Sequence, residues 1–210
     1  MPLYKSLDLN SQTIVKVWKI SESFDTLFSQ LVLKPESLER VSGMKSEWHQ
    51  KAFLSVRMLL IDFGYTDSDL FYDSFGKPYL KDEKYISISH SYHFSTVVIS
   101  SVEVGIDIEK QRSKIIKIAP KFIGFETFCL NEKDPAQVQK LIWVWCAKEA
   151  LYKLFGTPGM IFKKHFIVLP FGTESNKTTA WIVQENRKLK FTATFMEFEG
   201  FGCVITESEI

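Results

Sequence analysis

The stretch Gly105-Ile106-Asp107-Ile108-Glu109 decides how this sequence is interpreted. Apolar residues alternate in it with carboxylates, which is the period of a strand that turns one face to a protein core. Asp107 and Glu109 then share a face, about 7 Å apart along the strand. Two such carboxylates repel each other unless a cation lies between them. Spacing alone fits an edge strand with a solvated acidic face at least as well.

A second candidate lies in the stretch Trp145-Cys146-Ala147-Lys148-Glu149-Ala150-Leu151-Tyr152-Lys153. The apolar period predicts a helix over 136–155, with Gly156 as its stop. Glu149 and Lys153 follow Trp145 at four-residue intervals, so the three share one helical stripe, with Lys148 adjacent to it. A surface ion pair of this kind is worth only about 0.3–0.5 kcal/mol. The tryptophan on the same stripe favours a partly buried site.

Three further stretches are weak signals when taken singly. Ser89 and His90 lie where a predicted strand ends in a loop at His90, and they suit a phosphate, although a capped turn explains them as well. In Gly76-Lys77-Pro78, the glycine lets the backbone approach a ligand closely, the lysine carries a charge, and the proline fixes the turn. Arg57 lies on a predicted helix, where a surface position is the ordinary explanation. Together with the carboxylates and lysines, these residues make up the parts of a site for Mg²⁺ and a polyphosphate.

The remaining patterns predict an α+β protein with mainly antiparallel sheet. Helices are expected at 24–33, 46–63, 115–122 and 136–155. Strands are expected at 14–20, 70–72, 85–89, 96–101, 104–108, 162–169, 178–184, 189–198 and 201–206. The strands 96–101 and 104–108 are expected to be antiparallel neighbours, and residues 185–188 to form a turn.

Composition excludes several classes of protein. The 210 residues carry 26 basic and 25 acidic side chains, a net charge of +1, which does not favour broad nucleic-acid binding. The three cysteines lack a disulfide or metal spacing, so we expect buried thiols. The first five residues, MPLYK, lack a signal-peptide pattern, and no apolar run nears the roughly 18 residues that span a bilayer. We expect a cytoplasmic protein that binds neither nucleic acid nor membrane.

The order of these motifs resembles that of the 4′-phosphopantetheinyl transferases, specifically the larger, surfactin-synthetase-activating type. GKPYL at 76–80, ISHS at 88–91, GIDIE at 105–109 and WCAKEALYK at 145–153 correspond to that family's blocks in sequence order. FLSVRMLL at 53–60 resembles the family's helix that carries an arginine. The resemblance spans roughly residues 48–155, and the last two blocks are the most specific.

The resemblance implies a transferase that moves the 4′-phosphopantetheine group from coenzyme A to a serine of an apo acyl or peptidyl carrier protein. Adenosine 3′,5′-bisphosphate is the second product, and Mg²⁺ is required. The implied metal ligands are Asp107, Glu109 and Glu149, and the implied catalytic residues are Glu149, as general base, and Lys153. The residues implied to bind coenzyme A are Arg57, Gly76, Lys77, Pro78, Ser89, His90, Lys148 and Lys153.

The resemblance also implies a monomer built as a pseudo-dimer of two similar α+β halves, 1–103 and 104–210, with the active site in the cleft between them. Residues 121–126 match the family pattern only in part, so Glu126 is left out of the site. Two other functions stay open. One is a different Mg²⁺-dependent phosphotransferase or phosphohydrolase, which would act on nucleotides without a carrier, and the other is a non-catalytic coenzyme A-binding protein.

Overall fold

A computed structural model describes residues 3–185 and 187–208. Met1 and Pro2 of the N-terminal stretch, and Asn186 of the expected turn, lie outside the described residues. The chain divides into two compact units, Met1–Val102 (unit 1) and Glu103–Ile210 (unit 2). None of the described helices has the length and apolar composition needed to cross a bilayer.

Unit 1 is built on a four-stranded antiparallel sheet with the strand order β1-β2-β6-β5. These strands are β1 (Leu3–Asp8), β2 (Thr13–Lys19), β5 (Tyr85–Ser91) and β6 (Phe94–Ser100). Its helices are α1 (Phe24–Phe28), α2 (Pro35–Ser42) and α3 (Glu47–Asp62). A short 3-10 turn, Asp67–Asp69, leads into the hairpin of β3 (Leu70–Tyr72) and β4 (Pro78–Leu80).

Helix α3 supplies much of the core of unit 1. Its fully buried residues include Leu54, Leu59 and Leu60, which recur at the helical period and pack with the apolar face of the sheet. Burying one such leucine stabilises the fold by about 1.5–3 kcal/mol. All seven residues of β6 are buried, as expected for an inner strand. Helix α3 contacts both β2 and β6, so it fixes the middle of this sheet.

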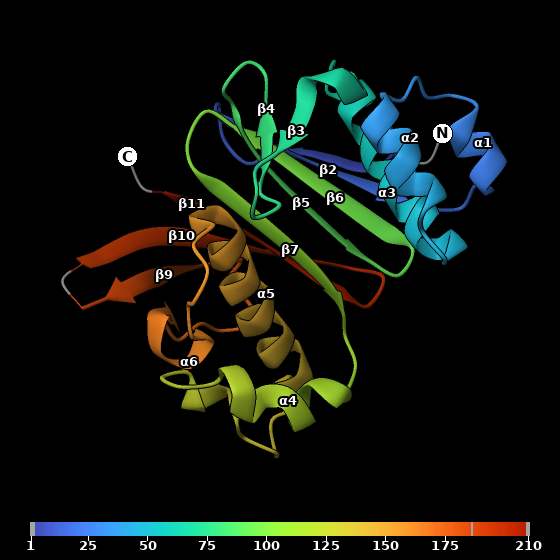
Figure 1. The fold of residues 1–210 in the computed structure, drawn as a ribbon. Helices are drawn as coiled ribbons and strands as arrows, with labels where there is room; N and C mark the ends of the chain where they lie inside the picture. Colours follow the sequence, from blue (N-terminus) through green and yellow to red (C-terminus); the bar gives the residue numbers. More distant parts are fainter. Residues whose placement is uncertain (1–2, 186, 209–210) are drawn as a thin grey trace. The chain divides into compact units, whose positions relative to one another are not determined.

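Unit 2 is built on a five-stranded antiparallel sheet with the order β7-β11-β10-β9-β8. These strands are β7 (Val104–Lys110), β8 (Phe166–Val168), β9 (Lys177–Gln184), β10 (Arg187–Phe198) and β11 (Phe201–Ser208). Its helices are α4 (Lys114–Phe122), α5 (Gln137–Phe155) and α6 (Phe162–His165), with a 3-10 turn at Thr127–Cys129. Figure 1 shows the long helix α5 beside β7, with α4 and α6 beyond it.

Two glycines let α5 lie directly on the sheet. A Cβ on Gly105 of β7 would lie 2.0 Å from the carbonyl oxygen of Ala150, and one on Gly202 of β11 would lie 2.8 Å from Ile142. Both distances are far below van der Waals contact, so only glycine permits this approach. Helix α5 ends at Gly156, whose φ of 69° is the left-handed conformation of a helix C-cap.

The two units repeat one connection pattern. In unit 1, β2 pairs with the last strand, β6, which pairs in turn with the strand before it, β5. In unit 2, β7 pairs with the last strand, β11, which pairs with β10. The long helix, α3 or α5, lies in the chain between the first strand and the final hairpin of its unit. The predicted α+β fold with antiparallel sheets is confirmed.

Several local predictions were wrong. Strands β6 and β7 belong to different sheets, and the strand that pairs with β7 is β11. The helix predicted at 24–33 ends at Phe28, and a new helix begins at Pro35, which suits a first helical turn. The strand predicted at 162–169 starts as helix α6, where the amide of Ile161 donates to Nδ1 of His165 across 2.8 Å. Residues 78–80 form a strand that was not predicted.

Candidate functional site

The acidic motif on β7 and the helical stripe on α5 meet at Lys153. Lys153 Nζ donates to Oδ1 of Asp107 across 2.7 Å and to the main-chain carbonyl of Ile106 across 3.1 Å. The Asp107 side chain is 8% exposed, whereas that of Lys153 is 30% exposed. The ion pair therefore has a buried carboxylate on one side and a solvent-accessible ammonium on the other.

Glu149 lies within electrostatic range of this pair. Its pKa is raised to about 7, first by burial and then by the negative charges of Asp107 and Glu109, while the Lys153 ammonium acts to lower it. Glu149 and Glu109 are both half-buried. Glu149 thus interacts electrostatically with Asp107, Glu109 and Lys153, and all four residues lie on β7 and α5 of unit 2.

The donor chemistry of this cluster fits a hard divalent cation. Carboxylate oxygens are the ligands that Mg²⁺ takes from proteins, and it usually takes only one or two of them, together with waters and substrate phosphates. Burial is the first cause of the raised pKa of Glu149, and the charges of Asp107 and Glu109, which such a cation would offset, add to it. In this structure the Lys153 ammonium supplies positive charge at Asp107. No three His, Cys, Asp or Glu side chains of the described residues are grouped closely enough to hold a metal ion by themselves.

Lys148 does not join this cluster, which corrects the expectation that it faces a phosphate. Its side chain is fully buried and its Nζ donates to Oε2 of Glu126 across 2.8 Å. The same ammonium donates to the carbonyls of Phe122, at 2.8 Å, and Phe162, at 3.1 Å. An ammonium has three N–H donors, so these acceptors occupy it fully. Glu126, which was left out of the site, is the buried partner of this lysine.

Arg57 is likewise engaged inside unit 1, against the expectation that it contacts coenzyme A. Its side chain is 3% exposed, and Nε donates to Oδ1 of Asp67 across 3.0 Å. The guanidinium also lies 3.5 Å from the ring centroid of Phe53, within cation–π range. A guanidinium held in this way has its charge neutralised inside the protein.

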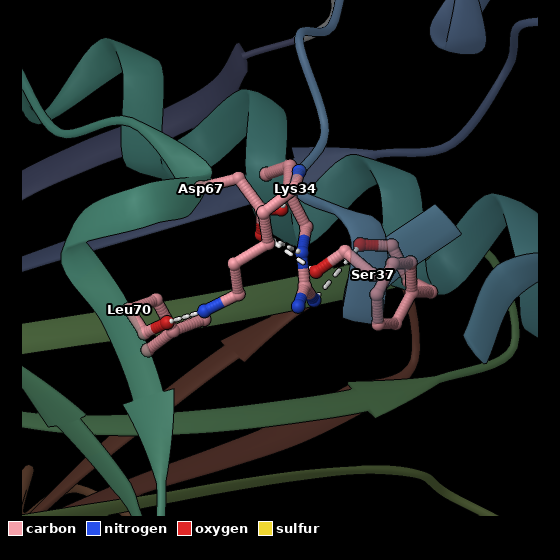
Figure 2. A network of polar contacts seen from close by, with 6 residues as sticks. Lys34, Ser37, Asp67 and Leu70 are labelled. Carbon is pink, nitrogen blue, oxygen red and sulfur yellow. Dashed lines mark hydrogen bonds and ion pairs between the residues drawn. The ribbon is translucent and has the colours of Figure 1, made fainter. Parts of the chain in front are cut away.

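The Asp67 carboxylate accepts further hydrogen bonds from the N-terminal end of α2 and its N-cap residue, Lys34. Ser37 Oγ donates to Oδ1 across 3.1 Å, and the amide of Lys34 donates to Oδ2 across 3.0 Å. Figure 2 shows Lys34, Ser37 and Asp67 in this network, with the Lys34 ammonium turned to the carbonyl of Leu70. The network ties helices α2 and α3 to the 3-10 turn, so its role is structural.

Ser89 and His90 both lie on strand β5, which continues to Ser91 and so includes His90, where a loop was expected. Ser89 is buried and its carbonyl accepts a hydrogen bond from Thr96, while His90 is exposed. The ring centroid of His90 lies 6.5 Å from that of His49 at the start of α3. Sequence reasoning did not identify His49, since nothing in its neighbourhood along the chain links it to residue 90.

Gly76, Lys77 and Pro78 form the tip of the β3–β4 hairpin. Asp73 organises the turn, because its Oδ1 accepts from the amides of Phe75, at 2.8 Å, and Lys77, at 2.9 Å. Gly76 has a φ of 83°, the left-handed region that glycine adopts without strain. The Lys77 and Pro78 side chains are half-buried. The predicted turn is confirmed, and its binding role stays a prediction.

Comparisons with known proteins match part of the chain. Residues 103–196 match the family model of the 4′-phosphopantetheinyl transferase superfamily. A 4′-phosphopantetheinyl transferase (gsp) of Aneurinibacillus migulanus is 31% identical over 134 residues, which are 62% of this chain and 54% of that protein. A 4′-phosphopantetheinyl transferase of Bacillus subtilis is 33% identical over 86 residues, 39% of this chain and 38% of that protein. The chain thus spans about half, or less, of these relatives.

A solved structure, the holo-[acyl-carrier-protein] synthase of Thermotoga maritima, matches at 21% identity with a TM-score of 0.40, over 51% of this chain and 63% of that one. The matched residues 103–196 include both β7 and α5, the two elements that carry the carboxylate cluster. The resemblance drawn from the motifs is therefore confirmed: residues 103–196 of this chain match the 4′-phosphopantetheinyl transferase superfamily.

Proposed function

We propose that the protein transfers the 4′-phosphopantetheine group of coenzyme A to a serine hydroxyl of an apo carrier protein and releases adenosine 3′,5′-bisphosphate. The observation that carries this proposal is the cluster of Asp107, Glu149 and Lys153 inside the region that matches the superfamily. Carboxylates beside a lysine at a partly accessible position suit a reaction on a pyrophosphate.

In the proposed step, the serine oxygen forms a bond to the β-phosphorus of coenzyme A. The bond from that phosphorus to the bridging oxygen breaks, and the bridging oxygen leaves with adenosine 3′,5′-bisphosphate. The serine proton moves to Glu149, a half-buried carboxylate beside Asp107 and Lys153. Lys153, which is 30% exposed, is positioned to neutralise charge that develops on the phosphate oxygens.

Asp107, Glu109 and Glu149 would hold the Mg²⁺ ion in this proposal. When bound, the ion would offset charge on the pyrophosphate while the bond breaks. Asp107 and Glu109 then act only in binding the cation, whereas Glu149 also accepts a proton. The three residues should therefore respond differently to substitution.

Residues of unit 1 are proposed to bind the nucleotide part of coenzyme A. His90 is exposed and can become cationic, so it suits a phosphate. Ser89 precedes it on β5, and Gly76, Lys77 and Pro78 offer a turn with an adjacent charge. Arg57 and Lys148 are not part of this proposal, because each forms a buried ion pair within its own unit.

Mass spectrometry of apo carrier proteins incubated with the enzyme, coenzyme A and Mg²⁺ tests the proposal. A gain of one phosphopantetheine per carrier is expected, and it should be lost in Asp107→Ala and in Glu149→Gln. Glu132→Gln is the matched control, since Glu132 is an exposed carboxylate of the same unit. Full loading by both site variants would overturn the assignment. Phosphate or nucleotide release without any carrier would favour a different phosphotransferase.

A further inference from the structure

The turn of α5 that carries Glu149 is held on one side by a buried ion pair. Lys148 Nζ lies 2.8 Å from Oε2 of Glu126, and both side chains are 0% exposed. The ammonium also donates to the carbonyls of Phe122 and Phe162. These acceptors belong to the end of α4 and the start of α6, so one lysine joins three segments to α5.

The carboxylate of Glu126 extends the connection to the sheet. Its Oε1 accepts from the amide of Val168 on β8 across 3.0 Å, and its Oε2 accepts from the amide of Gly124 across 3.2 Å. A buried pair whose remaining hydrogen-bonding groups are also satisfied is rigid and has one preferred geometry. Breaking it by removing one partner leaves an uncompensated charge in the interior.

The same turn of α5 is held on another side by β7. The carbonyl oxygen of Ala150 lies where a Cβ of Gly105 would be, so backbone meets backbone at this point. Glu149 lies between Lys148 and Ala150 in sequence, and Lys153 follows one turn later. The orientation of α5 about its own axis is therefore fixed by contacts that immediately flank Glu149.

Small rotations of α5 matter at this site. Side-chain ends lie about 5 Å from a helix axis, so a rotation of roughly 10° displaces them by about 1 Å. A misplacement of about 1 Å lowers a reaction rate by about 100-fold in well-aligned active sites. The 2.7 Å contact between Lys153 and Asp107 would be lost under such a displacement.

We propose that Lys148 and Glu126 are positioning residues, which fix α5 so that Glu149 and Lys153 face Asp107. The proposal rests on the proposed transfer function for its kinetic consequences, but its structural consequence is independent of any substrate. Lys148 then acts through α5 and not on coenzyme A.

The double variant Lys148→Met/Glu126→Met tests this role. It leaves no unpaired charge in the interior, because two apolar side chains replace the pair, so it should remain folded. It removes the directed hydrogen bonds to three segments. Lys140→Met/Asp134→Leu is the matched control, since it removes another ion pair of α5, with an Nζ–Oδ2 distance of 2.6 Å, at the opposite end of the helix.

We expect kcat for carrier loading to fall at least 10-fold in Lys148→Met/Glu126→Met, while KM for coenzyme A changes less than twofold. Both constants should stay close to wild type in the control Lys140→Met/Asp134→Leu. Amide hydrogen exchange, read by mass spectrometry without any substrate, should accelerate in residues 147–155 of α5 only in the double variant. Wild-type kcat in the folded double variant would overturn the proposal, as would a rise in KM alone, which would make Lys148 a coenzyme A ligand.

The exchange measurement separates this proposal from the proposed function. If the wild-type protein loaded no carrier, the transfer function would fail, yet faster exchange in 147–155 would still support the positioning role. Unchanged exchange in those residues would overturn it whatever the activity. Should the double variant not fold, Lys148→Met/Glu126→Gln takes its place with the same expected exchange and kcat, because it also removes both charges and keeps an acceptor for the amide of Val168.

Discussion

Lys153 on α5 and Asp107 on β7 are joined by a 2.7 Å ion pair, although 46 residues separate them in sequence. The pair links the motif at 105–109 to the motif at 145–153. It places an ammonium beside Asp107 and within electrostatic range of Glu149. Because Lys153 also binds the carbonyl of Ile106, it fixes the end of α5 to the strand that carries the acidic motif. Its replacement should affect the charge of the whole cluster.

Lys153→Met removes the one positive charge that opposes the raised pKa of Glu149. We expect the pKa of Glu149 to rise further and carrier loading at neutral pH to fall by about 100-fold or more. Lys153→Arg, which keeps the charge, should retain more activity than Lys153→Met. Rates of loading at several pH values are the measurement, and equal rates for the two variants would show that the charge at this position is unimportant.

Glu149→Gln should make the protein more stable at high pH. Burial, then Asp107, raise the pKa of Glu149 from 4.5 to about 7, so the folded protein holds this proton more tightly than the unfolded chain. The stability from Glu149 protonation is complete below about pH 4.5 and is lost as the pH rises through about 7. Above about pH 8, without Mg²⁺, the variant should exceed wild type by about 1–3 kcal/mol.

The two proteins should be equally stable near pH 4, where Glu149 is protonated in both the folded and unfolded states. Urea denaturation at pH 4, 6 and 8 gives the free energies of unfolding that decide this. If the free energies of unfolding of the variant and the wild type differed equally at all three pH values, Glu149 would affect stability through packing instead of charge.

Gly105→Ala should destabilise the fold without touching any charged group. Its Cβ would lie 2.0 Å from the carbonyl oxygen of Ala150, which belongs to a helix backbone and cannot turn away. We expect a loss of about 3 kcal/mol or more, at the upper end for overpacking, by urea denaturation. Gly172→Ala is the control, because nothing lies within 4 Å of its Cβ position. Wild-type stability of Gly105→Ala would show that α5 can move away from β7.

Arg57→Met and His90→Ala should have opposite effects on protein stability and on coenzyme A binding. Arg57→Met leaves Asp67 as a buried charge without its partner, so a loss of about 3–5 kcal/mol in the free energy of unfolding is expected. The affinity of the Arg57→Met variant for coenzyme A, measured by calorimetry on the folded protein, should stay near wild type.

His90→Ala should leave stability nearly unchanged and weaken coenzyme A binding several-fold, because His90 is exposed. A stable Arg57→Met that binds coenzyme A poorly would return Arg57 to the binding site.

The periods of the two motifs predicted which residues of β7 and of α5 share a face, whereas the family resemblance implied that the two motifs form one site. Alternation placed Asp107 and Glu109 on one face of a strand, and the four-residue interval placed Glu149 and Lys153 on one face of a helix. The sequence pattern could not explain why residue 105 is a glycine, since the reason is the carbonyl of Ala150 on helix α5. Nor did alternation identify the strand partner of β7, since the period defines faces and not neighbours.

The two wrong assignments, Arg57 and Lys148, share one cause. Each cation was assigned by its charge, although its helical position lies among core residues. Arg57 is three residues after Leu54 and three before Leu60, and both leucines are fully buried. Lys148 lies at the same kind of position between Val144 and Leu151, which are also fully buried. The helical period alone therefore indicated burial, and a buried cation requires an internal carboxylate, here Asp67 or Glu126.

The repeated strand order also governs how the chain reaches its native state. Thr13 of β2 pairs with Ser100 of β6, and Val104 of β7 pairs with Glu207 of β11, so each sheet joins the two ends of its unit. Such distant pairings must close large loops before they stabilise anything, and they slow folding. During synthesis, unit 1 can complete its sheet before β11 exists, whereas β7 must wait for the final strand of unit 2. Until then β7 and β10 both present unpaired edges, and this is the interval in which the nascent chain is most exposed to aggregation.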